Sequence, residues 1–143
     1  MRSTMLAMLL VFSAIFPRLL HAADEFTATD YSGVYDCKGV DGHEGEYAGT
    51  VTLSIRPAYS SGNYASYDFK LEVPEYGAYL GHAAGNGNHL AMHFALTDPA
   101  SRDFGTGIAK FRTDAQGRQT FHKFYFQPEY KGGNSGIEDC VKR

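Results

Sequence analysis

The chain has 143 residues, of which 43% are hydrophobic, and its formal charge at pH 7 is −3. This length suits one domain, and the composition is too apolar for a disordered chain. The net charge is negative and no cluster of lysine or arginine occurs, which argues against nucleic acid and anionic membrane surfaces as partners.

The first 23 residues have the composition of a secretory signal peptide. Arg2 supplies a basic start, residues 5–16 form an apolar run, Pro17 breaks that run, and small residues follow at Ala22 and Ala23. The apolar run is too short to be kept as a membrane span. Cleavage after Ala22 or Ala23 removes two arginines and no acid, so the charge changes from −3 to −5. The sequence therefore predicts a single exported domain at 24–143, periplasmic or secreted, with no membrane insertion.

Aromatic residues and glycine dominate the predicted domain. All ten Tyr, eight of the ten Phe and all sixteen Gly lie in it, and the chain has no Trp. Flat rings pack well on pleated strands, and glycine permits a positive φ at tight turns. This composition favours an all-β domain.

Alternation of apolar and polar residues predicts strands along the whole domain. The alternation is clearest at 50–56 and 64–73, where every second residue is apolar, and turn-forming residues separate the other segments. The predicted strands are 31–38, 50–56, 64–73, 76–84, 89–97, 105–113, 120–127 and 137–141, with one helical turn after Asp98-Pro99. Short loops join them, which predicts an antiparallel up-and-down meander.

The cysteines bear on how the meander ends. Eight sequential strands leave two open edges unless the first strand pairs with the last. Cys37 and Cys140 are the only cysteines, and they lie in the first and last predicted strands. In an exported protein we expect them to form a disulfide, the alternative being two free thiols. The sequence therefore predicts a closed barrel of about eight strands with a disulfide at its seam.

The predicted meander, with Gly33-Val34-Tyr35 in its first strand, resembles the calycin group of barrels, which includes the lipocalin and avidin types. Those barrels typically carry Gly-x-Trp in the first strand, and Tyr35 stands here in the place of the Trp. The resemblance implies the barrel architecture and no particular ligand. A biotin site is not carried over, because avidin-type pockets depend on several Trp residues.

Three histidines crowd one predicted hairpin. A loop at 85–88 would place His82, His89 and His93 together on the outer face, with His82 opposite Ala91. His82 and His93 are then weak candidates for a metal pair as diagonal neighbours, but no third ligand can be identified. We predict a solvated polar face and no metal site.

Residues 38–46 combine acidic side chains with three glycines. Asp41, His43, Glu44 and Glu46 lie here, and their spacing matches no calcium or zinc template. We interpret this acidic segment as a strand connector. The alternative is that it docks onto a basic partner.

Catalytic and cofactor motifs are poor. Ser135 does not complete a Gly-x-Ser-x-Gly elbow, because Ile137 stands in the place of the second Gly. Both cysteines are expected to be oxidised, and paired carboxylates fall in loops or near an end. Gly105-Thr106-Gly107 begins a predicted strand, whereas a phosphate-binding loop precedes a helix. We predict that the protein is not an enzyme and has no cofactor.

The stretch 121–133 is the richest in aromatic residues. If Lys123 faces water, Phe121 and Tyr125 on the same side of the strand are exposed as well. The residues that would then point inward are His122, Phe124 and Phe126. Together with Tyr130 in the following glycine-rich loop, Phe121 and Tyr125 become candidates for binding a ligand or partner. The alternative is that a loop or the terminal segment covers them.

Two functions fit these expectations. The first is an exported, non-enzymatic barrel that binds an unknown ligand at an open end. The second is an inhibitor or immunity-type factor that binds an envelope or foreign enzyme through the acidic segment. Interior volume separates them, because no ligand cavity remains if the core is filled by Tyr67, Phe69, Phe94, Phe111, Phe124 and Phe126.

Overall fold

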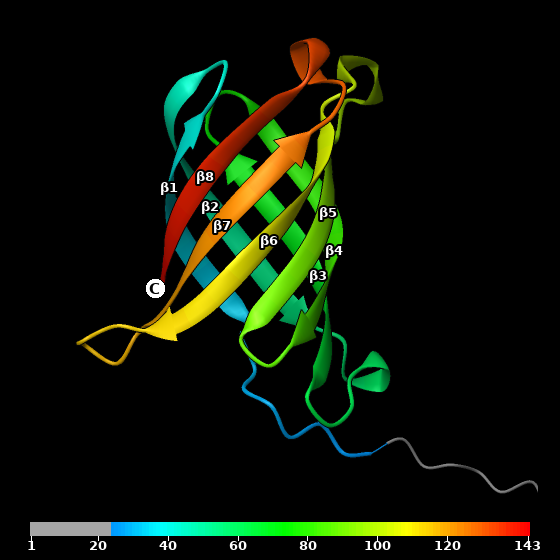
Figure 1. Cartoon of the computed structure of the whole chain (residues 1–143), viewed down its shortest axis with the longest axis vertical. Coiled ribbons are helices and arrows are strands. Elements are labelled where there is room, and N and C mark those ends of the chain that lie inside the picture. The colour runs from blue at the N-terminus through cyan, green and yellow to red at the C-terminus, as the bar shows by residue number, and fades with distance from the viewer. Residues whose placement is uncertain (1–23) are drawn as a thin grey trace, which may run out of the picture.

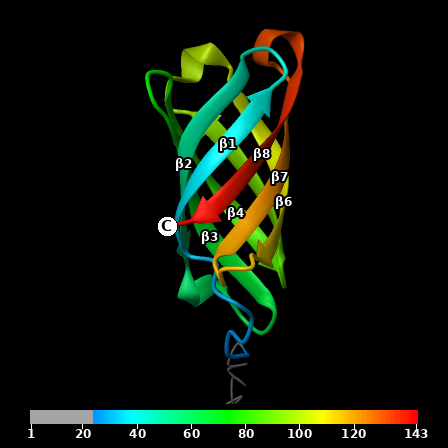
Figure 2. The ribbon, with the colours of Figure 1, turned by 90° about the vertical axis from the view of Figure 1, so that its left-hand side faces the viewer.

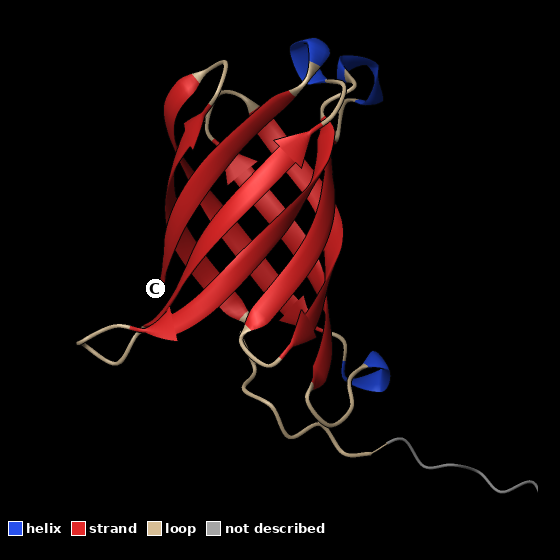
Figure 3. Cartoon of the chain, viewed as in Figure 1, coloured by secondary structure: helices blue, strands red, loops and turns tan. Residues whose placement is uncertain are grey.

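The protein folds as a closed barrel of eight antiparallel strands (Figures 1 and 3). A computed structural model describes residues 24–143, so the predicted signal peptide lies outside the described residues. The strands are β1 (Gly33–Asp41), β2 (Gly45–Ile55), β3 (Tyr64–Val73), β4 (Gly77–Asn86), β5 (His89–Leu96), β6 (Phe104–Thr113), β7 (Gln119–Gln127) and β8 (Asn134–Lys142).

Each strand pairs with the next one in sequence, and β8 pairs with β1 to close the barrel (Figure 2). The seam joins residues 35–41 of β1 to residues 136–142 of β8. The predicted architecture is therefore confirmed. Closure pairs both outer strands of the meander, which leaves no open sheet edge.

The disulfide predicted at the seam is also confirmed. Cys37 lies directly opposite Cys140, and their sulfurs are bonded. Both cysteines are buried and face the barrel interior. A buried disulfide is compatible with an oxidising compartment outside the cytosol.

The alternating pattern determines which side chains fill the interior. On β3, Ala65, Tyr67, Phe69 and Leu71 are buried, whereas the residues between them face outward. The same alternation holds around the barrel, so the core is a layer of inward-facing side chains dominated by Tyr and Phe. Two predicted core residues, Phe124 and Phe126, are instead on the outside.

Three strands extend at least three residues beyond their predicted bounds. β1 continues to Asp41, β2 begins at Gly45, and β8 begins at Asn134. The acidic segment therefore lies within the β1–β2 hairpin, and only residues 42–44 form the connecting turn. The predicted helical turn is present at Pro99–Ser101, where the Asp98 carboxylate accepts a hydrogen bond from the Ala100 amide. Two further 3-10 turns lie at Pro57–Tyr59 and Tyr130–Gly132.

The β4–β5 hairpin is tighter than predicted. Asn86 pairs with His89, so the turn is Gly87-Asn88 and not the four residues 85–88. Gly87 has a φ of +58°, which suits the first position of a type II′ turn. The tighter turn moves the pairing of the two strands by two residues.

Within residues 24–143 no helix has the length and hydrophobicity needed to cross a membrane.

Candidate ligand-binding site

The two ends of the barrel differ, and one of them is closed by the chain itself. Before entering β1, the N-terminal segment crosses this end, which we call the floor (Figure 1). The Tyr31 ring packs 4.1 Å from that of Phe111, and the Tyr31 amide donates a hydrogen bond to the Tyr67 hydroxyl. Tyr35 donates its hydroxyl proton to the Tyr31 carbonyl oxygen at 2.8 Å. These buried contacts make the floor a continuous part of the core.

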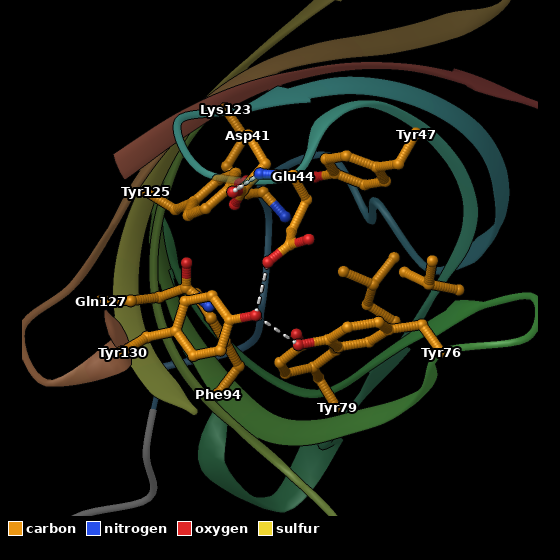
Figure 4. Close-up of a pocket in the computed structure, with 12 residues that line it drawn as sticks. Asp41, Glu44, Tyr47, Tyr76, Tyr79, Phe94, Lys123, Tyr125, Gln127 and Tyr130 are labelled. Atoms are coloured by element: carbon orange, nitrogen blue, oxygen red, sulfur yellow. Dashed lines mark hydrogen bonds between the residues drawn. The ribbon is translucent and has the colours of Figure 1, made fainter. Parts of the chain in front are cut away.

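The opposite end, which we call the mouth, holds a cavity of about 80 Å³. The β1–β2 turn, the β3–β4 turn and the two 3-10 turns at Pro99–Ser101 and Tyr130–Gly132 surround it (Figure 3). Side chains from the barrel wall and from these turns converge on the cavity (Figure 4). Its lining residues are Asp41, Glu44, Tyr47, Leu71, Val73, Tyr76, Tyr79, Phe94, Lys123, Tyr125, Gln127 and Tyr130.

A buried ion pair lies at the inner end of the cavity. Lys123 on β7 pairs with Glu138 on β8, and both side chains are inaccessible to solvent. Tyr47 donates a hydrogen bond to the second Glu138 oxygen at 2.8 Å. The Lys123 ammonium also lies between 5.4 and 5.8 Å from the ring centres of Phe69, Phe94 and Tyr125. Its charge is therefore stabilised by a carboxylate and by aromatic faces.

Two glycines allow the neighbouring tyrosines to reach their positions. A Cβ on Gly39 would lie 2.3 Å from the Tyr47 ring, and a Cβ on Gly136 would lie 2.3 Å from the Tyr125 hydroxyl oxygen. Each glycine is paired with its tyrosine across the sheet. Any side chain at either glycine would displace the ring, so these positions fix two walls of the cavity.

Hydrogen bonds between side chains join the four turns at the rim. The Tyr130 hydroxyl donates to Glu44, and the Tyr76 hydroxyl lies 3.0 Å from the Tyr130 oxygen (Figure 4). The Tyr76 hydroxyl also lies 3.0 Å from Asp103. The Tyr79 hydroxyl donates to the same Asp103 oxygen at 2.6 Å. We call these five residues the tyrosine chain. It links the β1–β2 turn to the β3–β4 turn and to both 3-10 turns.

Asp41 is held at the side of the mouth by neutral donors. Burial raises the pKa of this carboxyl, but hydrogen bonds from Tyr125, from the backbone amides of Glu44 and His43, and from Asn134 outweigh burial and lower the pKa below its ordinary value. Asp41 is therefore ionised at neutral pH and accepts four hydrogen bonds.

The phenol groups around the cavity stay protonated. Burial raises the pKa of Tyr47, Tyr79 and Tyr125 well above the ordinary value, and neighbouring carboxylates raise it further. Tyr76 is shifted in the same direction, mainly by burial and by its hydrogen bonds to Tyr130 and Asp103. Each phenol can therefore act as a hydrogen-bond donor or acceptor and not as a base.

The predicted facing of β7 is wrong. Phe121, Lys123 and Tyr125 point into the barrel and are at most 5% exposed, whereas His122, Phe124 and Phe126 are on the outer face. Pairing with Glu138 is the physical reason, because it allows a lysine to be buried. Phe121 packs against Tyr35 in the core, so only Tyr125 and Tyr130 among the three aromatic candidates reach the cavity.

The histidine face is outward, as predicted, but its pairing differs. His82 lies directly opposite His93, with ring centres 5.5 Å apart, and His82 Nδ1 lies 3.0 Å from Asp68. His89 lies near the turn, opposite Asn86. Among the described residues, the only group of three possible metal ligands is Cys37, Glu138 and Cys140, and its two sulfurs are bonded to each other.

The acidic segment is divided between the cavity and the outer surface. Asp41 and Glu44 face the mouth, and Glu44 pairs with Lys131 as well as with Tyr130. His43 Nε2 lies 3.0 Å from the Gly133 carbonyl oxygen, which connects this hairpin to the turn before β8. Glu46 is exposed on the outer side of β2.

Sequence reasoning missed most of the polar groups at the site. Tyr76 and Asp103 lie in or beside turns. Lys123 was taken to face water, and Glu138 belongs to the paired carboxylates that were expected near the chain end. One feature of the sequence could have indicated that Lys123 points inward. Phe121 pairs with Cys140, so a disulfide in the interior places Phe121, Lys123 and Tyr125 on the inner face once β7 and β8 are aligned.

A row of apolar side chains crosses the outer face of five neighbouring strands. The strand register places Ala91, Ile108, Phe124, Ile137 and Val40 next to one another on β5, β6, β7, β8 and β1. Ile108 is 65% exposed, and Phe124, Ile137 and Val40 are between 43% and 49% exposed. We call these residues the outer apolar row.

Comparison with known proteins adds no relative: no family model matches the chain, and no curated protein is significantly similar to it in sequence.

Proposed function

We propose that the protein is an exported, non-enzymatic barrel that binds a small ligand in the cavity at its mouth. The observation that carries the proposal is the asymmetry of the barrel: one end is filled by the N-terminal segment, and the other keeps a cavity lined by aromatic rings and a few convergent polar groups. Small-molecule sites in proteins have this combination of apolar walls and fixed polar groups.

The exported location is part of the same proposal. The leader-like sequence at 1–23 and the buried disulfide both support a periplasmic or secreted protein. The polar groups around the cavity suit binding better than catalysis, since the carboxylates and the lysine are engaged in ion pairs and hydrogen bonds with one another.

Filling the cavity is expected to abolish binding. Val73 lines the mouth, and Val73→Phe adds a ring to a space of about 80 Å³. We expect phenol, whose ring matches the tyrosines of the wall, to shift the NMR signals of Leu71, Tyr76 and Tyr79 with a dissociation constant on the order of millimolar. The titration should be lost in Val73→Phe.

Val40→Phe is the matched control, because it adds the same ring on the outer face of β1. It should leave the phenol titration unchanged. Signal shifts that fall outside the cavity, or that are equal in wild type and Val73→Phe, would contradict the proposed site.

A second candidate function is a protein-binding inhibitor or immunity-type factor, which we propose on the basis of the outer apolar row. A contiguous exposed apolar surface suits a protein partner. The acidic segment does not support this function, because Asp41 and Glu44 are bonded within the barrel. The test is a pull-down from envelope extract with the purified protein as bait. Phe124→Ser is expected to lose any enzyme that co-purifies with the wild type, and Val73→Phe is expected to keep it. Equal retention by both variants would contradict this candidate.

A further inference from the structure

The charges around the mouth favour a cation. Four carboxylates line the cavity or bond directly to residues that line it, and two ammonium groups accompany them. The carboxylates belong to Asp41, Glu44, Asp103 and Glu138, and the ammonium groups to Lys123 and Lys131. A positively charged guest therefore enters a region of negative potential, whereas an anion is repelled.

Two lysine ammonium groups in this region have the same kinds of binding partner. Lys123 faces aromatic rings and pairs with Glu138 inside the barrel. At the rim, the Lys131 ammonium lies 5.3 Å from the centre of the Tyr130 ring and pairs with Glu44. In both places an ammonium is bound by a carboxylate and the face of a ring. The mouth offers the same elements to a guest, since Glu44 and Tyr130 line the cavity together with Tyr76 and Tyr79.

The tyrosine chain also has too few protons for its contacts. Four oxygen–oxygen contacts join Glu44, Tyr130, Tyr76, Asp103 and Tyr79. Three phenol protons are available to them when both carboxylates are ionised, because each hydroxyl donates once. One contact is therefore left without a hydrogen. A guest that brings N–H donors would satisfy the remaining acceptors, whereas a guest with only acceptors would not.

We propose that the cavity binds a small primary amine in its ammonium form. The ammonium lies at the rim against Glu44, Tyr130 and Tyr76, and the hydrocarbon part of the ligand extends towards Leu71, Val73 and Phe94. This inference rests on the proposed function, which it deepens by naming the chemical class of the ligand.

Three probes of matched size and different charge test the inference: 2-phenylethylamine, 2-phenylethanol and 3-phenylpropionate. Each is titrated into the purified protein and followed by the NMR signals of the lining residues. We expect the amine to bind about two- to fivefold more tightly than the alcohol, which corresponds to one partly exposed charge contact, and the carboxylate to bind more weakly than both.

Charge variants at the rim locate the ammonium. Glu44→Gln is expected to reduce the affinity for the amine to that for the alcohol and to leave the alcohol unaffected. Lys131→Gln is expected to raise the affinity for the amine a few-fold, because it removes the internal ammonium that occupies Glu44. Glu72→Gln is the matched control: Glu72 also pairs with a lysine, Lys70, but it lies on the outer face of β3.

The outcomes distinguish the inference about amines from the proposal that the cavity binds a small ligand. If the alcohol or the carboxylate binds in the cavity at least as tightly as the amine, or if Glu44→Gln behaves like Glu72→Gln, the inference about amines is wrong and the binding cavity remains. If no probe shifts the lining residues and phenol also fails, both proposals are overturned.

Discussion

Replacing Lys123 by Met is expected to lower the free energy of unfolding by about 3 to 5 kcal/mol. Lys123 and Glu138 are both inaccessible to solvent, and the pair loses its cation in this variant. The Tyr47 hydroxyl then remains as the only hydrogen-bond donor to the Glu138 side chain among the described residues. An uncompensated carboxylate inside the barrel is costly, whereas the methionine fills the space of the lysine stem.

A second substitution separates charge from packing. The double variant Lys123→Met with Glu138→Gln removes both charges, keeps an acceptor for Tyr47, and should recover at least about 2 kcal/mol of the loss. Lys110→Met serves as the control, since Lys110 is exposed on the outer face of β6 and should change stability by less than about 0.5 kcal/mol. Urea denaturation measures all three variants. A loss below about 1 kcal/mol for Lys123→Met would contradict the expectation that Glu138 stays buried and charged without its cation.

Loss of the seam disulfide is expected to have a similarly large effect. Cys37 and Cys140 are separated by 103 positions in the sequence. Without the bond, the unfolded chain gains the entropy of this long loop, and the chain-entropy model gives about 4.7 kcal/mol for a loop of this size. We expect the double variant Cys37→Ala with Cys140→Ala to lose about 2 to 5 kcal/mol, because native-state effects offset part of the entropy.

The barrel itself should stay closed in this variant, since the backbone ladder between β1 and β8 does not depend on the sulfurs. Guanidinium denaturation with and without a reducing agent measures the effect. Reduction should destabilise the wild type and leave the double variant unchanged. The denaturant slope should rise on reduction, because the unfolded chain exposes more surface. Equal stability and equal denaturant slopes of the oxidised and reduced wild type would contradict this expectation.

The fold could be predicted from the sequence because two kinds of feature indicate it: the local alternation of the strands and the single pair of cysteines. A period of two over 64–73 indicates a strand with one buried face, and that face is the inner face of β3. Cys37 and Cys140 each lie in a strand, so one pair of residues indicated which strands meet at the seam. The glycine-rich ends of β1 and β2 escaped prediction, because Gly39 serves to accommodate Tyr47, a contact that the sequence alone does not show.

The candidate site was harder to predict because it depends on contacts between distant strands and turns. β7 carries aromatic residues on both faces, so its own pattern cannot distinguish inside from outside. The orientation is decided by Glu138 on β8, which faces the interior together with Cys140. The tyrosine chain joins Glu44, Tyr76, Asp103 and Tyr130 from four separate turns, and no local pattern links these positions.

The position of the floor has a practical consequence for attaching the protein to a surface. β8 runs from the mouth to the floor end, where the Arg143 amide donates a hydrogen bond to Val34 near the start of β1. The N-terminal segment before β1 lies at this end as well, so this segment and the C-terminus are both away from the mouth (Figure 1). A tag, fusion partner or sensor chip coupled at the C-terminus would therefore leave the cavity facing the solution.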